Sequence, residues 1–234
     1  MDREKALVII QSRFRGWLYR SRNLPNSLRY VKLLIEKSNS FSCHNEYDDG
    51  RVNSTIDEAN LLKLLGTLPE LNERIKCVKM RAWPDLLIKD FKYGWLPVNI
   101  KTTTTTTSDN TGNLASCVYA LTEHELDLSK KYNNGEMSII LIDAIQNKKF
   151  NRKLKKDYYF LVINKLTSEV IINSLRGLEK MNSNNYNLPY QVKWSINKIF
   201  VYRPIEKSVE MLKETIKRGG EVWLENFLQK IREL

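Results

Sequence analysis

The spacing of apolar residues predicts helices and strands mixed along the whole chain. Helical spacing, with apolar residues three or four positions apart, covers 2–22, 27–37, 55–68, 114–128, 206–218 and 221–232. Strand-like apolar runs cover 75–80, 86–88, 95–100, 138–145, 158–164, 169–172, 191–194 and 198–202. We therefore expect an α/β protein with a mixed central β-sheet flanked by helices.

The chain divides into an N-terminal helix, residues 1–25, and a single domain, residues 26–234. Apolar residues of the first segment share one helical face, while Arg13, Arg15 and Arg20 lie on the opposite face. Pro25 then ends the helix, because proline cannot continue one. Neither an internal repeat nor a clear linker divides the remainder.

The N-terminal helix also fits the IQ pattern, IQxxxRGxxxR, at Ile10, Gln11, Arg15 and Arg20. Calmodulin-like proteins recognise such basic amphipathic helices in an acidic apolar groove. A calmodulin-like partner is therefore one expectation for this segment. The alternative is a helix that packs on its own domain, with its arginines facing solvent or the DNA backbone.

Composition narrows the class of protein and of partner. The 234 residues carry a net charge of +11, with 42% hydrophobic content, which suits a globular domain with a basic surface. Such a charge favours polyanions, although a basic surface without a polyanionic partner explains it equally well. Three separated cysteines indicate neither a zinc site nor a disulfide framework, and no apolar run reaches membrane-spanning length. We expect an intracellular, cytoplasmic protein that does not enter the membrane.

The candidate chemistry lies in residues 83–107, where two apolar runs flank a Gly-containing turn and predict a β-hairpin. Asn99 and Lys101 are two apart in the second strand, so they share a face. Asp85 lies at the foot of the first strand and can lie beside them. A carboxylate, an amide and an ammonium group would then converge on one side of the hairpin.

Pro84-Asp85 followed by Asn99-Ile100-Lys101 resembles the motif of the PD-(D/E)xK nuclease superfamily, and Ile-Lys-Thr-Thr resembles EcoRV-like type II restriction endonucleases. The resemblance implies a restriction-endonuclease-like fold and Mg²⁺-dependent hydrolysis of double-stranded DNA, with Mn²⁺ as a substitute ion. It also implies a homodimer that cuts a specific, palindromic site. In this resemblance Asp85 and Asn99 would hold metal, and Lys101 would orient the attacking water.

Glu58 is the acid that the resemblance places on the helix before the hairpin, as a further metal ligand. The residues around it give a second interpretation. Ser54 or Thr55 would be the helix N-cap, with Glu58 in the first turn as its capping-box partner. The two roles are compatible.

Asn99 departs from the family pattern, which has Asp or Glu at that position. An amide oxygen can coordinate a metal but brings no charge, so metal affinity and rate should fall. Either an inactivating substitution or natural divergence accounts for it. Asp90 does not replace it, since its parity relative to Asp85 points it to the other strand face. A catalytically inactive DNA-binding protein and an RNA-directed nuclease are therefore kept as alternatives.

DNA contacts are expected from the end of the second strand and the loop after it. Thr102, Thr103 and Thr104 can donate hydroxyl groups to phosphates, and Asn110 and Asn113 can reach base edges or phosphates. The alternative for the threonines is simple strand extension, and for the asparagines an ordinary surface loop.

Overall fold

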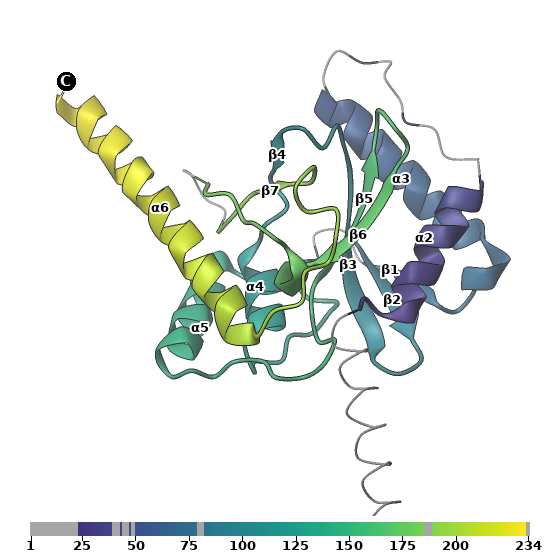
Figure 1. Cartoon of the computed structure of the whole chain (residues 1–234), viewed down its shortest axis with the longest axis horizontal. Helices are drawn as coiled ribbons and strands as arrows, with labels where there is room; N and C mark the ends of the chain where they lie inside the picture. Colours follow the sequence, from purple (N-terminus) through teal and green to yellow (C-terminus); the bar gives the residue numbers. More distant parts are fainter. Residues whose placement is uncertain are drawn as a thin grey trace, which may run out of the picture.

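The computed structural model describes residues 23–38, 43, 47, 50–78, 82–184 and 189–232, without the side chains of 50, 51 and 222–232. Its centre is a mixed β-sheet with the strand order β1-β2-β3-β5-β6. Helices cover both faces of this sheet, and a small second sheet, β4-β7, lies beside it (Figure 1). The expected α/β architecture, a mixed central sheet flanked by helices, is confirmed.

The predicted hairpin is formed by β2 (Leu86–Asp90) and β3 (Gly94–Thr103), paired antiparallel with Leu86 opposite Val98. Gly94 leaves the turn at φ 74°, a conformation that glycine adopts without steric cost. On the outer side, β1 (Ile75–Cys77) pairs antiparallel with β2. On the inner side, β5 (Tyr159–Asn164) pairs parallel with β3. β6 (Val170–Ser174) follows β5 through a tight turn and completes the sheet.

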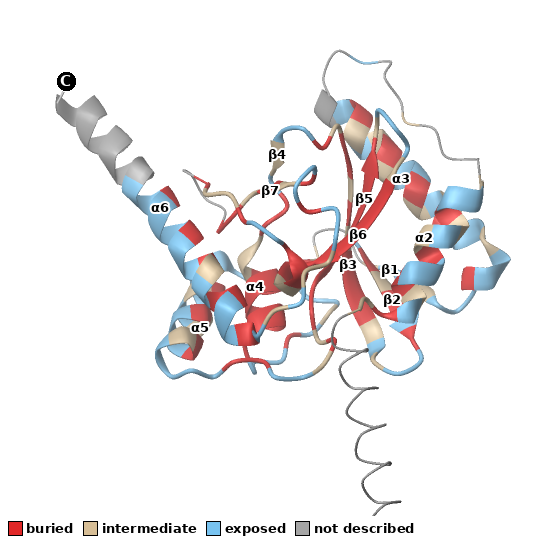
Figure 2. Ribbon diagram, in the orientation of Figure 1, coloured by how far each residue is buried: buried red, intermediate tan, exposed pale blue. Residues whose placement is uncertain are grey.

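β5 lies between β3 and β6 and is buried on both faces, because helices cover both sides of the sheet (Figure 2). Phe160 and Val162 belong to one apolar core, and Leu161 and Ile163 to the other. This alternation follows from the strand period of two. Two hydrophobic cores therefore lie on opposite faces of one sheet.

The core that contains Leu161 and Ile163, called here the first core, is covered by α2 (Asn26–Ser38) and α3 (Gly50–Thr67), followed by the short 3₁₀ helix η1 (Pro69–Leu71). The second core is covered by α4 (Leu114–Leu121), α5 (Asn134–Gln146) and the start of α6 (Ile205–Arg232). η2 (Leu175–Gly177) and β7 (Val192–Lys193) join this side, with β7 pairing β4 (Ser108–Asp109). In Figure 1 the two helical groups lie to the right and left of the sheet.

Residues 138–145 form part of helix α5, so the predicted buried strand there is wrong. Asn133 accepts a hydrogen bond from Gly135 N at 2.8 Å and begins the helix. Met137, Leu141 and Ala144 are buried at helical spacing, whereas Ile139 is 69% exposed. A continuous apolar run has no periodicity that distinguishes a buried strand from a helix, so the sequence pattern alone did not identify this helix.

α3 begins at Gly50, earlier than predicted, so Ser54 and Thr55 are not its N-cap. Both lie inside the helix, and Glu58 is two turns beyond its start rather than in its first turn. The capping interpretation of Glu58 is therefore wrong. Its side chain remains available to the hairpin.

The two helices predicted at the C-terminus are one continuous helix, α6, that runs through Gly219 and Gly220. A Cβ atom on Gly219 would lie 2.3 Å from the carbonyl oxygen of Asn184. This glycine thus permits a close helix–loop approach rather than a break. Two further boundaries differ: the 114–128 helix ends at Leu121, and 198–202 is not a strand.

The IQ-like residues Ile10, Gln11, Arg15 and Arg20 lie outside the described residues, so the calmodulin-like partner stays an expectation. Within the described part of the chain, no helix combines the length and apolar character needed to cross a bilayer.

Leu161→Ala should destabilise the fold by about 2–5 kcal/mol, because Leu161 is 1% exposed in the centre of the sheet and its truncation leaves a cavity. Leu166→Ala is the matched control, since Leu166 is 71% exposed, and should change stability by about 0.5 kcal/mol or less. Urea unfolding monitored by circular dichroism measures both. Equal effects of the two substitutions would contradict the burial of β5.

Candidate functional site

The candidate site forms where β3 continues beyond its partner β2. β2 begins at Leu86, opposite Val98, but β3 runs on to Thr103, so its last residues have no strand neighbour on that side. Backbone groups there need other partners. Asp85 accepts a hydrogen bond from Ile100 N at 2.7 Å, and Ser54 of α3 donates to Thr102 O at 3.3 Å. Helix α3 and the Asp85 turn thus cover the open edge.

Asp85 and Asn99 meet directly at this edge. Asn99 Nδ2 donates to Asp85 Oδ2 at 2.6 Å, so one carboxylate oxygen receives both the side-chain amide and Ile100 N. Asn99 Oδ1 is buried and has no hydrogen-bond partner in the described part of the molecule. The expected juxtaposition of Asp85 and Asn99 is therefore present, with the amide N–H facing the carboxylate.

Lys101 and Glu58 complete the group. Lys101 Nζ lies 3.2 Å from Glu58 Oε1, and both side chains are a little more than one quarter exposed. Charges of both residues act on the Asp85 carboxylate. Glu58 from α3, Asp85 before β2, and Asn99 and Lys101 from β3 are thus brought together, as the sequence predicted. We refer to these four residues as the candidate site.

The pKa of Asp85 is raised to about 6. Enclosure of the carboxylate by neighbouring atoms is the main cause, and the negative charge of Glu58 adds to it. Hydrogen bonds from Ile100 and Asn99 and the charge of Lys101 oppose the rise. Burial of the Asp85 carboxylate therefore favours its protonated form.

The Trp83-Pro84-Asp85 turn is held in place by aromatic packing in the second core. Trp83 is 8% exposed, and its ring stacks on Tyr158 with a centroid distance of 5.5 Å. The Tyr158 hydroxyl donates to Trp83 O at 3.1 Å. Burial raises the pKa of Tyr158 well above its ordinary value, and the charge of Asp85 adds to this rise, so the hydroxyl keeps its proton. These contacts therefore hold the backbone that carries Asp85 in place.

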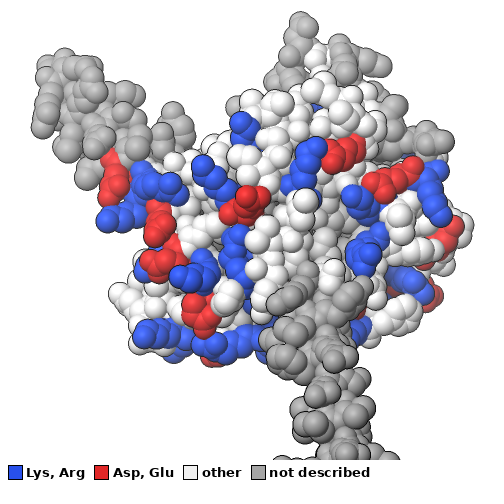
Figure 3. Space-filling model, in the orientation of Figure 1, with Lys and Arg blue, Asp and Glu red and all other residues white. Residues whose placement is uncertain are grey.

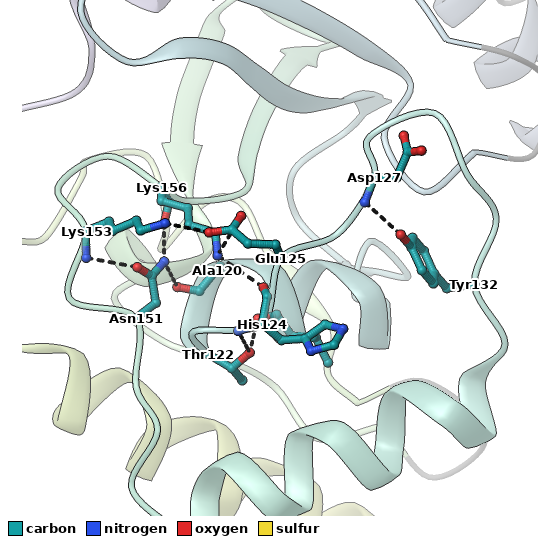
Figure 4. Close-up of polar contacts among 10 residues, drawn as sticks. Ala120, Thr122, His124, Glu125, Asp127, Tyr132, Asn151, Lys153 and Lys156 are labelled. Atoms are coloured by element: carbon teal, nitrogen blue, oxygen red, sulfur yellow. Dashed lines mark hydrogen bonds and ion pairs between the residues drawn. The ribbon is translucent and has the colours of Figure 1, made fainter.

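The segment after α4 anchors the other end of Trp83, whose Nε1 donates to Asp127 O at 3.1 Å. Figure 4 shows how this segment is itself fixed. Asn151 Nδ2 donates to Ala120 O and to Lys156 O, and Lys156 Nζ donates to His124 O at 3.1 Å. The His124 side chain is exposed on this loop.

Lys and Arg residues of the dense basic run 148–156 are largely paired within the molecule. Four ion pairs hold it: Lys149 with Asp143, Arg152 with Glu206, and Lys153 and Lys156 with Glu125. On the face seen in Figure 3, basic and acidic side chains are likewise interleaved, most clearly along α6. The net charge of +11 is therefore not gathered in one patch on that face.

Three of the five expected DNA contacts have structural partners instead. Thr102 is 1% exposed and Thr103 7% exposed, so strand extension is their role. Asn113 is the N-cap of α4, with Oδ1 accepting from Ser116 N at 2.7 Å. Thr104 is half-buried, with its hydroxyl 3.1 Å from that of Thr106, and Asn110 is exposed. The expectation of direct DNA contact is therefore wrong for the two buried threonines, whereas for the half-buried Asn113, for Thr104 and for Asn110 it stays a prediction.

Asp109 is a site neighbour that sequence reasoning missed. Its pKa is raised, chiefly by burial, and the charges of Lys101 and Glu58 both act on it. Its Oδ2 is buried and has no hydrogen-bond partner among the described residues. The pairing of β4 with β7 places it there, and no local pattern in the sequence indicates that pairing.

The donors of the candidate site meet part of what a divalent cation requires. No group of three or more His, Cys, Asp or Glu side chains suited to a metal ion occurs in the described ranges. Mg²⁺, however, needs few protein ligands because it keeps several waters. The Asp85 carboxylate and the unpartnered Asn99 Oδ1 are hard oxygen donors of that kind, once the Asn99 amide turns over. The candidate site thus fits Mg²⁺ with a sparse donor set.

Asp90, excluded as a substitute acid, has a structural role. It is 7% exposed and accepts hydrogen bonds from Ser27 Oγ at 2.9 Å and from Lys92 N at 2.9 Å. Its carboxylate therefore joins the hairpin turn to the start of α2, away from the candidate site.

Comparison with protein-family models, with curated proteins and with solved structures found no match in any of the three.

Asp85→Asn should stabilise the metal-free protein more at pH 7 than at pH 4. Because the folded pKa of about 6 exceeds the ordinary value of 3.8, the folded state keeps the proton to higher pH, and stability falls as pH rises through that window. A shift of this size corresponds to at most ~3 kcal/mol, and solvent contact reduces it to about 1 kcal/mol. Thermal unfolding in EDTA at the two pH values measures the difference.

Asp143→Asn is the control. The pKa of Asp143 is lowered, first by its hydrogen bond with Lys149, so the stability that its ionised form contributes is largely present already at pH 4, and the effect of this substitution should change little between pH 4 and pH 7. An effect of Asp85→Asn that does not change with pH would contradict the raised pKa of Asp85.

Proposed function

We propose that this chain is a metal-dependent endonuclease of the PD-(D/E)xK type that hydrolyses phosphodiester bonds in double-stranded DNA. The observation that supports it is the meeting of Glu58, Asp85, Asn99 and Lys101 at the open edge of β3. These residues come from a helix, a turn and a strand, with sequence separations of 14 for Asp85–Asn99 and 43 for Glu58–Lys101. A restriction-endonuclease-like fold is part of the same proposal.

Each residue has a role that its position allows. Asp85 and Asn99 Oδ1 would hold Mg²⁺, which when bound neutralises phosphate charge and acidifies water. Lys101 would contact the scissile phosphate and orient the attacking water, with its ammonium group positioned by Glu58. Because burial raises the pKa of Asp85 to about 6, a proton would compete with the cation for its carboxylate below about that pH.

Asn99 also supports a second candidate, a DNA-binding protein on the same fold that does not cleave. Its amide N–H lies 2.6 Å from Asp85 Oδ2, where a cation would otherwise neutralise that carboxylate. A neutral hydrogen bond thus satisfies Asp85 without metal. The wild-type chain is expected to cleave slowly or not at all.

The proposed substrate sets the expected assembly. Two strands of a palindromic site present two equivalent scissile phosphates, so a two-fold homodimer places one candidate site on each. Mn²⁺ is expected to replace Mg²⁺ in the assay, since both take oxygen ligands.

Asn99→Asp should raise metal-dependent cleavage of supercoiled plasmid DNA by about 10²-fold or more, because it restores a second charged ligand. Adding Lys101→Ala to that variant should remove about 10²–10⁴-fold of the rate. Nicked and linear products on agarose gels, with Mg²⁺ or Mn²⁺, measure both.

Lys198→Ala is the matched control, since Lys198 also pairs with a glutamate, at 2.5 Å from Glu169 Oε2, but away from the candidate site. It should leave cleavage unchanged. Absence of cleavage by every variant, together with salt-dependent duplex binding, would replace the nuclease with the DNA-binding protein. Cleavage of RNA but not DNA would reassign the substrate.

Asn99→Asp should also make thermal stability depend on metal, independently of activity. Two carboxylates would face each other where Asn99 Nδ2 now lies 2.6 Å from Asp85 Oδ2, so the metal-free variant loses stability. Mn²⁺ should restore it, by about 2.7 kcal/mol at 100 times its dissociation constant. Differential scanning fluorimetry in EDTA and in Mn²⁺ measures this, and an equal response of the wild-type protein would count against it.

A further inference from the structure

Two side-chain amides are joined at the end of the small β4-β7 sheet. Gln191 Nε2 donates to Asn110 Oδ1 at 2.6 Å, and Asn184 Nδ2 donates to the same oxygen at 3.3 Å. Asn110 is exposed and Gln191 is partly exposed. We refer to Asn110 and Gln191 as the amide pair.

The hydrogen bond within the amide pair fixes what each amide offers to solvent. Asn110 Oδ1 accepts both hydrogen bonds, so its Nδ2 remains as a donor. Gln191 Nε2 uses one of its two N–H groups, and its Oε1 remains as an acceptor. We call Asn110 Nδ2 and Gln191 Oε1 the outer atoms, and no hydrogen bond to either is found in the described part of the protein. The amide pair thus retains one donor group and one acceptor for a ligand.

The backbone beneath the amide pair is held from both ends. Asn182 and Gln191 exchange two backbone hydrogen bonds, at 2.9 and 2.8 Å. A Cβ atom on Gly112 would lie 2.5 Å from Tyr190 O, so only glycine lets this loop pack so closely there. Thr111 N bonds Asp109 O at 3.0 Å. Such a rigid backbone reduces the entropy lost when the pair binds a ligand.

The amide pair also lies close to the candidate site along the chain. β3 carries Asn99 and Lys101 and ends at Thr103, and β4 follows at Ser108–Asp109. Asn110 comes directly after Asp109, on which the charges of Lys101 and Glu58 act. In Figure 1 the β4-β7 sheet lies beside the end of β3.

We propose that the amide pair reads an adenine in the major groove of the DNA substrate, and is a specificity determinant of this protein. Adenine presents N7 as an acceptor and the N6 amino group as a donor, which matches the outer Nδ2 of Asn110 and the outer Oε1 of Gln191. This inference rests on the proposed DNA substrate but not on cleavage. The pair would select sequence, whereas the candidate site performs the chemistry.

A binding selection tests the inference without requiring activity. The full chain is incubated with a random duplex library, with Ca²⁺ in place of Mg²⁺, and the bound sequences are determined. The wild-type protein should enrich an adenine at one position or at its symmetric pair. Gln191→Ala should reduce that preference by roughly 5- to 150-fold.

Asn110→Asp gives the sharper test. One carboxylate oxygen still accepts from Gln191 Nε2, while the outer donor becomes an acceptor, which suits the amino group of cytosine. The preferred base at that position should change from adenine to cytosine. Asn147→Ala is the control, because its Nδ2 also bonds within the molecule, to Asp143 Oδ1 at 2.7 Å, but away from the β4-β7 sheet, and it should leave the selected sequence unchanged.

The outcomes separate the two proposals. A defined sequence that neither Asn110→Asp nor Gln191→Ala alters, with both variants folded by circular dichroism, overturns the base reading and leaves DNA as the partner. Absence of any duplex binding overturns the DNA substrate itself, and the base reading with it.

Discussion

The short hydrogen bond from Ile100 N to the Asp85 carboxylate, at 2.7 Å, is the constraint on which the rest of the site depends. β3 is longer than the strand beside it, so its edge must be satisfied by something other than a strand. A side-chain carboxylate does this, and it is thereby fixed beside Asn99 and within the field of Lys101 and Glu58. Asp85 Oδ2 therefore both completes the edge of β3 and contacts Asn99 in the candidate site.

Local patterns in the sequence predicted the parts of the fold that depend on neighbouring residues. The hairpin and its Gly94 turn, the β5-β6 pair and the shared face of Asn99 and Lys101 all follow from short-range rules. α5 was misassigned because its apolar run has no period to read. The start of α3 was misplaced because Gly50 is an uncommon first helical residue, so Glu58 lies two turns into the helix rather than in its first turn.

Long-range contacts explain what the sequence could not show. Asp109 comes near Lys101 only because β4 pairs with β7, more than eighty residues further along the chain. The basic run of 148–156 has the charge of a nucleic-acid contact, yet its side chains meet Asp143, Glu125 and Glu206 from three separate segments. Charge counted along a chain thus says little about charge offered to a partner.

The contacts of the site join residues at very different separations along the chain, so they can form at different stages of folding. Asp85 and Asn99 are 14 residues apart and belong to one hairpin, whereas the bond from Tyr158 to Trp83 closes a separation of 75. Short loops close before long ones, because their entropy cost is smaller. During synthesis the acid and the amide can therefore meet well before β5 exists. The packing of Tyr158 on Trp83, which holds them in place, can form only when the second half of the chain has been synthesised.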